Sequence, residues 1–114
     1  MKFPDMITEL PEADIPFSGI RGWLLQGENK QIVFMDIDPI GKVDEHSHSA
    51  QFGVLLDGEM SLTIRGETKR YKKGDSYYIP NKVPHSAVFH SQVKVMDMFN
   101  EKERYSIKKN NKVK

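Results

Sequence analysis

Apolar and polar residues alternate along most of this chain in runs of four to seven residues, which is the pattern of strands with one buried face. Turn-forming residues such as Gly27-Glu28-Asn29 and Asp38-Pro39 separate the runs, and helix signals are nearly absent. We expect strands at residues 20–26, 32–37, 43–48, 51–56, 61–65, 69–72, 76–79, 85–89 and 93–99. Asp57-Gly58 lies between two apolar runs and predicts a tight hairpin. The whole pattern predicts an all-β sandwich or barrel.

The strand that begins at Gln51 has two contrasting faces. Successive side chains on a strand point to opposite sides, so if Gln51 points into the barrel, Gly53 and Leu55 do as well. The outer face is then unusually apolar and consists of Phe52, Val54 and Leu56. Because an exposed apolar strand is a liability for a monomer, we expect a homodimer that buries this face. Cover by the N-terminal segment is the alternative.

The two ends of the chain depart from the strand pattern. The first 16 residues carry three prolines and scattered apolar side chains, which favours an extended arm. The last residues, KKNNKVK, are basic and polar, which favours an unpacked tail. We therefore expect an N-terminal arm at residues 1–16, one barrel domain at 17–107 and a disordered basic tail at 108–114.

Three histidines and a glutamine lie where two strand signals are expected to converge. His46 and His48 are two residues apart, so on a strand they would point the same way, with Cα atoms about 6.6 to 7 Å apart. Such a pair alone is weak evidence, because His-x-His also occurs by chance in solvated segments. Gln51 follows three residues later, and His85 begins a strand after the bend between Pro80 and Pro84. Together these four side chains predict a site for a divalent metal ion.

The spacing of these residues resembles a known family. Gly41, His46-x-His48, Gln51 and Gly58 resemble the first cupin motif, and Gly74, Pro80 and His85 resemble the second. The resemblance implies a small RmlC-like cupin, a jelly-roll barrel also called a double-stranded β-helix. It also implies one divalent metal ion held by His46, His48, Gln51 and His85. The chain departs from the family pattern at Gln51, where Glu is usual, and at Lys82, where Gly is common.

Asp97 is a carboxylate on the inward face of the last expected strand, with Val93, Val95 and Phe99. Burying an unpaired charge is costly, so Asp97 needs a partner or a task. A structural ion pair with Arg104 and a catalytic role near metal-bound water are the two interpretations. The same alternation turns His90 away from the site, which predicts an ordinary surface histidine.

The expected ligand set carries no negative charge. Three neutral imidazoles and an amide leave the double charge of the ion uncompensated, so the ion should be a strong Lewis acid and attract anions. This modestly favours non-redox polarisation of a carboxylate or carbonyl group over oxygen activation. Nickel, zinc, manganese and iron(II) are all compatible with these ligands.

One cupin subgroup is similar in size and motif, namely the pectin-degradation cupins that linearise 4,5-unsaturated uronates. The matching segment is Asp97-Met98-Phe99, followed by Arg104. The resemblance implies a metal-dependent isomerase or lyase of carbohydrate metabolism, with Asp97 and Arg104 as catalytic residues. We expect Phe99, Tyr78 and Trp23 to contact the substrate, and Tyr77, like Tyr78 and Trp23, is a candidate for a hydrogen bond at the pocket mouth. An Fe(II)-dependent dioxygenase and a non-enzymatic small-molecule-binding cupin are the alternatives.

Composition narrows the partners. The 17 Lys and Arg residues nearly balance the 16 Asp and Glu residues, which gives a formal charge of +1 and no electrostatic footprint for nucleic acid. The chain has no cysteine, no signal-like segment and no apolar run of 18 residues. We therefore expect a cytoplasmic protein that binds a small molecule, with no membrane or nucleic-acid partner.

Overall fold

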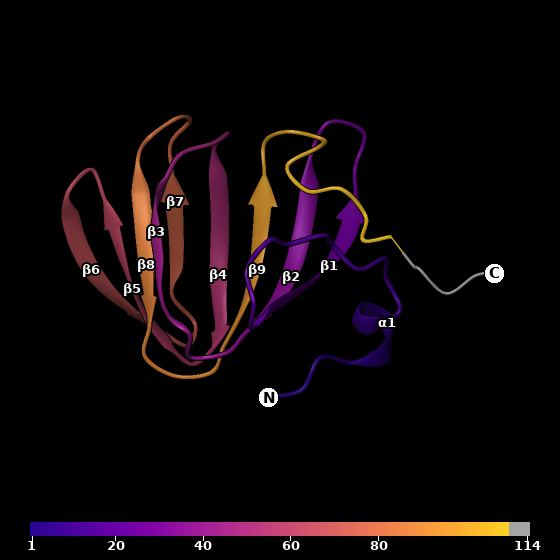
Figure 1. Cartoon of the computed structure of the whole chain (residues 1–114), viewed down its shortest axis with the longest axis horizontal. Helices are drawn as coiled ribbons and strands as arrows, with labels where there is room; N and C mark the ends of the chain where they lie inside the picture. The colour runs from indigo at the N-terminus through magenta and orange to yellow at the C-terminus, as the bar shows by residue number, and fades with distance from the viewer. Residues whose placement is uncertain (110–114) are drawn as a thin grey trace.

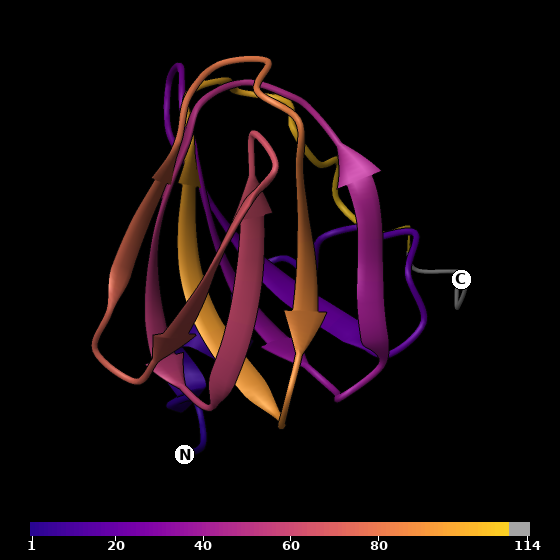
Figure 2. The same ribbon diagram turned by 90° about the vertical axis from the view of Figure 1, so that its left-hand side faces the viewer.

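The computed structural model describes residues 1–109 as two antiparallel β-sheets that face one another (Figures 1 and 2). One sheet has five strands in the order β1-β2-β9-β4-β7, and the other has four in the order β3-β8-β5-β6. The strands are β1 (Ile20–Gln26), β2 (Gln31–Ile37), β3 (Gly41–His46), β4 (Gln51–Asp57), β5 (Glu59–Ile64), β6 (Glu67–Lys72), β7 (Ser76–Ile79), β8 (His85–Phe89) and β9 (Val93–Phe99). The prediction of an all-β barrel is confirmed.

Alternation of apolar and polar residues determines which side chains enter the barrel. In β2, every second residue from Gln31 to Ile37 is buried, and in β4 the inward residues are Gln51, Gly53 and Leu55 as expected. These side chains pack against those of the opposite sheet, such as Met60 and Leu62 of β5. The largest fully buried apolar side chains are Val33, Leu55, Ile79, Val93, Val95 and Phe99. Burial of this layer supplies the main stabilisation of the fold.

The turn at Asp57-Gly58 has a different role from the predicted one. Gly58 has a φ of 89°, a left-handed conformation that favours glycine, so the tight turn exists. The strands on either side, β4 and β5, belong to different sheets and do not pair, so the hairpin prediction was wrong. The turn instead carries the chain from one sheet to the other. A tight hairpin joins β5 to β6, where Arg65 and Gly66 both have positive φ.

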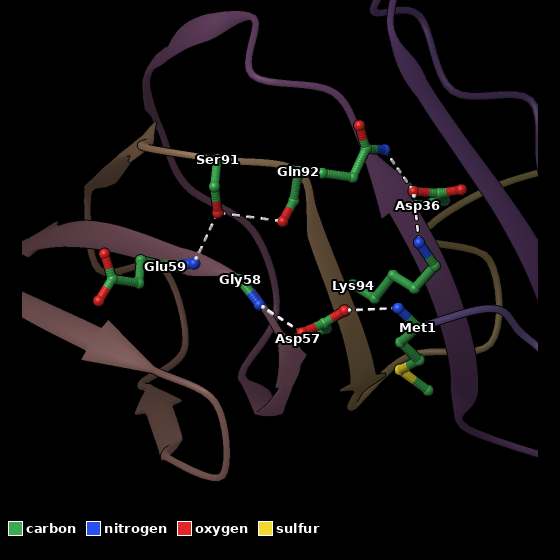
Figure 3. A network of polar contacts seen from close by, with 8 residues as sticks. All are labelled: Met1, Asp36, Asp57, Gly58, Glu59, Ser91, Gln92 and Lys94. Carbon is green, nitrogen blue, oxygen red and sulfur yellow. Dashed lines mark hydrogen bonds and ion pairs between the residues drawn. The ribbon is translucent and has the colours of Figure 1, made fainter.

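Polar contacts join neighbouring segments at the end of the barrel that contains the Asp57-Gly58 turn (Figure 3). Asp36 of β2 accepts hydrogen bonds from Gln92 at 2.6 Å and from Lys94 at 3.3 Å, and the Ser91 hydroxyl accepts one from the Glu59 amide at 3.0 Å. These contacts lie at the start of β9. The end of β9, at Phe99, reaches the opposite end of the barrel, where the predicted site lies.

The N-terminal arm is not fully extended. Asp5–Thr8 form one turn of helix, α1, where extended chain was expected, and the Phe3 ring packs edge-on against Trp23 and Phe34. Further along, Ala13 is buried and bridges to Ile107. Among the described residues, no helix has the length and apolar character needed to cross a membrane. Residues 110–114 of the predicted tail lie outside the described residues.

The outer face of the five-stranded sheet carries an apolar row that crosses every strand. Cross-strand pairing aligns Leu25, Ile32, Met98, Phe52 and Tyr78. Leu25 is 47% exposed, Phe52 is 41% exposed and Tyr78 is 59% exposed. The arm covers the neighbouring row through Phe3, but this row remains at the surface.

Candidate metal centre

Three imidazoles converge at one end of the barrel. His46 is the last residue of β3 and pairs with His85, the first residue of β8. His48 lies two residues beyond the end of β3, although the sequence predicted a strand through it. One ring nitrogen from each of the three histidines lies within 4.8 Å of the other two, and the Nε2 atoms of His48 and His85 are 3.1 Å apart.

A backbone carbonyl orients each of these imidazoles. The Nδ1 atoms of His46, His48 and His85 lie 2.8, 2.7 and 2.9 Å from the carbonyl oxygens of Asp44, Ser49 and Val83. A carbonyl oxygen can only accept a hydrogen bond, so each Nδ1 carries the proton. In a neutral ring the other nitrogen, Nε2, then presents a lone pair. This is the arrangement that holds histidine ligands around metal ions.

The cluster favours neutral rings. Burial lowers the pKa of His48 to about 4, and the nearby charge of Arg104 acts in the same direction. Burial also lowers the pKa of His85. At neutral pH these two rings therefore direct lone pairs toward one another across 3.1 Å. Two nitrogens bound to one tetrahedral zinc ion lie about 3.3 Å apart, given Zn–N bonds of about 2.0 to 2.1 Å, so the cluster fits a divalent cation.

The second motif is anchored to the first through Lys82. Its backbone N–H donates a hydrogen bond of 2.7 Å to the carbonyl of His48. Lys82 has a φ of 61°, in the left-handed region where glycine is the common choice. Lys82 therefore departs from the family pattern in residue type but keeps the left-handed backbone conformation that glycine adopts easily. The contact fixes the loop before β8 against the segment that carries His48.

A cavity of about 90 Å³ opens beside the imidazoles, with room for several water molecules. Most of its wall is apolar and includes Ile15 of the N-terminal arm and Phe17, the residue after the arm. The polar side chains gather around the histidine cluster and comprise His46, His48, Gln51, Tyr77, His85, Asp97, Arg104 and Tyr105.

The opposite wall holds a buried acid. Asp97 is 4% exposed, and its Oδ1 accepts a hydrogen bond of 2.6 Å from the Tyr77 hydroxyl. The two residues lie on β9 and β7, and Gly53 of β4 pairs with both. A Cβ atom at Gly53 would overlap the Tyr77 ring and the Asp97 carboxylate. Glycine at this position is therefore what lets the tyrosine reach across β4 to the acid.

Burial raises the pKa of Asp97 from 3.8 to about 6, although hydrogen bonding by Tyr77 and Gln51 partly opposes the shift. Contact with Asp97 and burial together raise the pKa of Tyr77 well above its usual value. The tyrosine therefore remains a hydrogen-bond donor at neutral pH. The carboxyl group, in contrast, can exchange a proton near neutral pH.

Arg104 does not pair with Asp97, so the structural ion pair, one of the two interpretations that the sequence left open, is not formed. Among residues 1–109, its guanidinium forms no ion pair with a carboxylate, and its buried Nε has no hydrogen-bond partner. The guanidinium lies 4.4 Å from the ring centre of Tyr105 and 5.6 Å from that of Phe99. The Phe99 ring in turn contacts His48 edge-on at 5.4 Å. The charge of Arg104 is thus held close to the imidazoles.

The comparisons with known proteins agree with this geometry. A family model described as a cupin domain matches residues 33–99. The chain belongs to the cupin family. No curated protein matches it in sequence.

Solved structures share the cupin fold at low sequence identity. An RmlC-like cupin from Shewanella frigidimarina matches with a TM-score of 0.74 and 24% identity, over 84% of this chain and 88% of that one. KdgF from Halomonas sp. matches with a TM-score of 0.69 and 19% identity, over 80% and 87%. Oxalate decarboxylase from Bacillus subtilis matches with a TM-score of 0.71 and 19% identity, over 84% of this chain and 28% of that one. Proteins with different names share this barrel, so the fold alone does not select a reaction.

Within this cupin, the predicted site residues fall into two groups. Gln51 and Phe99 line the cavity with the histidines, Asp97 and Arg104. Trp23 packs against Phe3, and Tyr78 lies on the outer face of the sheet, so neither lines the cavity as predicted.

The structure also places His90 and Tyr77, the two remaining candidates from the sequence. His90 is exposed and bonds Ser61 at 2.7 Å, as expected for a surface histidine. Tyr77 is the tyrosine that reaches the site. Tyr77 and Ile79 are two residues apart and point to the same, inward side of β7, and Tyr77 pairs with Gly53. This alternation is the sequence signal that could have identified Tyr77 as a site residue.

Proposed function

We propose that this cupin is a metal-dependent enzyme that opens the ring of a small anionic sugar acid without redox chemistry. The observation that carries the proposal is the pairing pattern inside the cavity. Asp97 and Arg104 both line the cavity that holds the three-histidine cluster, but they do not form an ion pair with one another. Within residues 1–109, an acid that can exchange a proton and a cation without an ion-pair partner thus lie beside the expected metal. These are the groups that a reaction on a carboxylate-bearing substrate requires.

The metal would be held by His46, His48 and His85, with the amide of Gln51 as a fourth ligand. A divalent ion bound by neutral ligands supplies Lewis acidity that polarises carboxylate and carbonyl oxygens. Gln51 is buried and lines the cavity, which supports this assignment. Nickel, zinc, manganese and iron(II) all suit imidazole and amide ligands.

Asp97 would move the proton. Opening a 4,5-unsaturated uronate removes the proton of the anomeric hydroxyl, breaks the ring C–O bond and leaves an enol that takes a proton at carbon. A carboxyl group with a pKa of about 6 can accept the first proton and return one later. The Tyr77 hydroxyl holds Oδ1 of this group in place at 2.6 Å.

Arg104 would bind the substrate carboxylate. A guanidinium presents paired N–H donors that match the two oxygens of a carboxylate. Its stacking on Tyr105 and Phe99 limits its motion, and no carboxylate among residues 1–109 pairs with it. The cavity is small, so a sugar acid would place its carboxylate end near the metal and extend toward Phe17, a lining residue that is 44% exposed.

Turnover of a 4,5-unsaturated uronate tests this function. The conjugated double bond absorbs ultraviolet light, so its loss on ring opening and tautomerisation reports the reaction. The wild-type protein, loaded in turn with zinc, nickel, manganese and iron(II), should consume the substrate. Asp97→Asn should lower kcat by about 100-fold or more with little change in KM, because it removes a proton-transferring group. His90→Ala, a histidine outside the cavity, is the matched control and should keep wild-type rates.

Three results would contradict the proposal. Wild-type turnover that survives Asp97→Asn would remove the acid from the mechanism. Iron-dependent oxygen consumption in an oxygen electrode, without consumption of uronate, would indicate the dioxygenase alternative. Saturable uronate binding without turnover under any metal would indicate a non-enzymatic binding protein.

We infer that a second copy of the chain covers the apolar row of Leu25, Ile32, Met98, Phe52 and Tyr78. The row crosses the whole five-stranded sheet without a charged residue, and three of its side chains are more than 40% exposed. A two-fold axis through the middle of the row would pack the same surface against itself.

Sedimentation of two matched variants tests the dimer. Phe52→Glu places a charge in the middle of the row and should give a monomer. Val88→Glu places the same charge on the outer face of the other sheet, where the side chain is 38% exposed, and should stay dimeric. A wild-type protein that sediments as a monomer at high concentration would contradict the inference.

A further inference from the structure

Gln31 is a buried polar residue far from Arg104 in the sequence but joined to it through Tyr105. It is the first residue of β2 and is only 2% exposed. Its Nε2 donates to the Tyr105 carbonyl at 2.8 Å, and its Oε1 accepts from the Tyr105 amide at 3.0 Å. The second Nε2 hydrogen goes to the Oε1 of Gln26 at 2.8 Å. The side-chain amide thus bonds the backbone of Tyr105 as a neighbouring strand would.

The segment that Gln31 holds has few other constraints near Arg104. After β9 ends at Phe99, residues 100–109 form no named strand. Asn100 bonds Ala50, Lys102 accepts a bond from Gln26, and the next backbone contact after Tyr105 is from Asp14 to Ser106. Between Lys102 and Ser106, the two bonds from Gln31 are therefore the backbone anchors in the described structure.

The position of the guanidinium depends on this anchor. Arg104 immediately precedes Tyr105 and lies over its ring at 4.4 Å. The Tyr105 ring in turn contacts Phe99 edge-on at 5.7 Å, and Phe99 is the strand partner of Gln31. Gln31, Tyr105 and Phe99 therefore form a continuous support that presents Arg104 to the metal end of the cavity.

We propose that Gln31 is a positioning residue for carboxylate recognition: its buried amide fixes Tyr105 and thereby holds the Arg104 guanidinium beside the histidine cluster. The inference rests on the proposed function, because it takes Arg104 as the group that binds the substrate carboxylate. Without the hydrogen bonds between Gln31 and Tyr105, the Arg104 side chain can sample other positions. Binding a ligand must then immobilise this side chain, and the entropy lost in doing so weakens the affinity. The effect should be confined to ligands that carry a carboxylate.

The test compares galacturonate with galactose, its neutral counterpart, by NMR titration of the zinc-loaded protein. Wild type should prefer galacturonate, and Arg104→Met should remove the preference. Gln31→Met has nearly the same shape but cannot bond Tyr105, and it should weaken galacturonate binding about tenfold while leaving galactose binding unchanged. In an Arg104→Met background, Gln31→Met should have no further effect on galacturonate.

Two variants complete the set. Gln92→Met makes the same substitution at the start of β9, where the lost bond is to Asp36, and should keep wild-type binding of both sugars. Gln26→Met removes, at an exposed position, the acceptor of the second Nε2 hydrogen of Gln31 together with the bond that Gln26 donates to the Lys102 carbonyl. It should weaken galacturonate binding about threefold, and it provides the test if Gln31→Met does not fold.

The outcomes separate the positioning role from a structural role and from the proposed function. The inference is overturned if Gln31→Met and Gln26→Met keep wild-type galacturonate affinity, or if both sugars weaken equally. It is also overturned if the effects of Gln31→Met and Arg104→Met add. If wild type shows no preference for galacturonate, the proposed function fails as well, which distinguishes that result from the others.

Discussion

The two sheets contribute different chemistry to the cavity between them. The four-stranded sheet supplies imidazoles, His46 from β3 and His85 from β8. The five-stranded sheet supplies the amide of Gln51, the hydroxyl of Tyr77 and the carboxyl group of Asp97. His48 lies in the loop between β3 and β4, one of the connections between the two sheets. One wall thus carries two of the imidazoles that could hold a metal ion, and the other carries the buried acid Asp97.

The two walls also differ in how their side chains are held. Each histidine is oriented by a carbonyl within two residues of itself. Asp97 is held by a tyrosine 20 residues away, and Arg104 lies beside a residue anchored 74 residues away. Local contacts leave a signature in short motifs, whereas distant contacts depend on strand register. We call the side with His46 and His85 the metal wall and the side with Tyr77 and Asp97 the acid wall. The comparison predicts that a substitution in one wall leaves the side chains of the other wall in place.

The largest effect should come from the metal wall. His85→Ala removes one of three imidazoles and should weaken zinc binding by about 1000-fold or more, because even loss of an outer-shell partner costs about 10- to 100-fold. Competition with a chromophoric chelator measures the affinity. His90→Ala should leave it unchanged, because this exposed histidine faces Ser61. Equal losses in the two variants would show that the barrel does not hold zinc at the histidine cluster.

The next effect should come from the acid wall. Gly53→Ala forces a methyl group into the Tyr77 ring and the Asp97 carboxylate and should lower the free energy of unfolding by about 3 kcal/mol. Chemical denaturation measures this change. Gly66→Ala is the control, because its added methyl meets open space and costs about 1 kcal/mol through its positive φ alone. A Gly53→Ala variant no less stable than Gly66→Ala would mean that Tyr77 does not cross β4.

The smallest effect concerns pH and the charge of Asp97 in chelator-treated protein. The folded pKa of about 6 lies above the usual 3.8, so wild-type stability falls as pH rises from about 4 to about 6 and then levels off. Asp97→Asn cannot ionise and can still accept the Tyr77 bond. It should therefore be more stable than wild type by about 2 kcal/mol at pH 8 and equal to it at pH 3.5.

Thermal unfolding at the two pH values measures this difference. Gln51, Tyr77 and Tyr105 are the groups that interact with the Asp97 carboxyl, and none is substituted in this comparison. Asp14→Asn, an exposed carboxylate, is the control and should change little at either pH. A stabilisation of Asp97→Asn that persists unchanged at pH 3.5 would contradict a raised pKa.

The range of the contacts explains how much the sequence could predict. Alternation located all nine strands within a few residues, and the His-x-His motif with a later histidine located the metal wall, because both are local patterns. The hairpin at Asp57-Gly58 was wrong because a tight turn signal does not specify which sheet the next strand joins. The cytoplasmic location and the fourth ligand, Gln51, stay predictions.

The acid wall was only partly predictable. Strand parity placed Asp97 inside, but its partner depended on the pairing of both β7 and β9 with β4, which no short motif reveals. The sequence therefore left an ion pair with Arg104 open as one of two interpretations of Asp97, and it named Tyr78 rather than Tyr77 among the expected substrate contacts. The role of Gln31 gave no sequence signal, because its contact lies 74 residues away.

Long-range ¹H–¹⁵N NMR of the histidine side chains during zinc titration tests the central claim most directly. The account predicts one zinc ion per chain, bound through Nε2 of His46, His48 and His85, with the proton of each ring on Nδ1. The signals of His90 should not move. Zinc uptake without changes at these three Nε2 atoms, or rings that carry the proton on Nε2 in the presence of zinc, would contradict it.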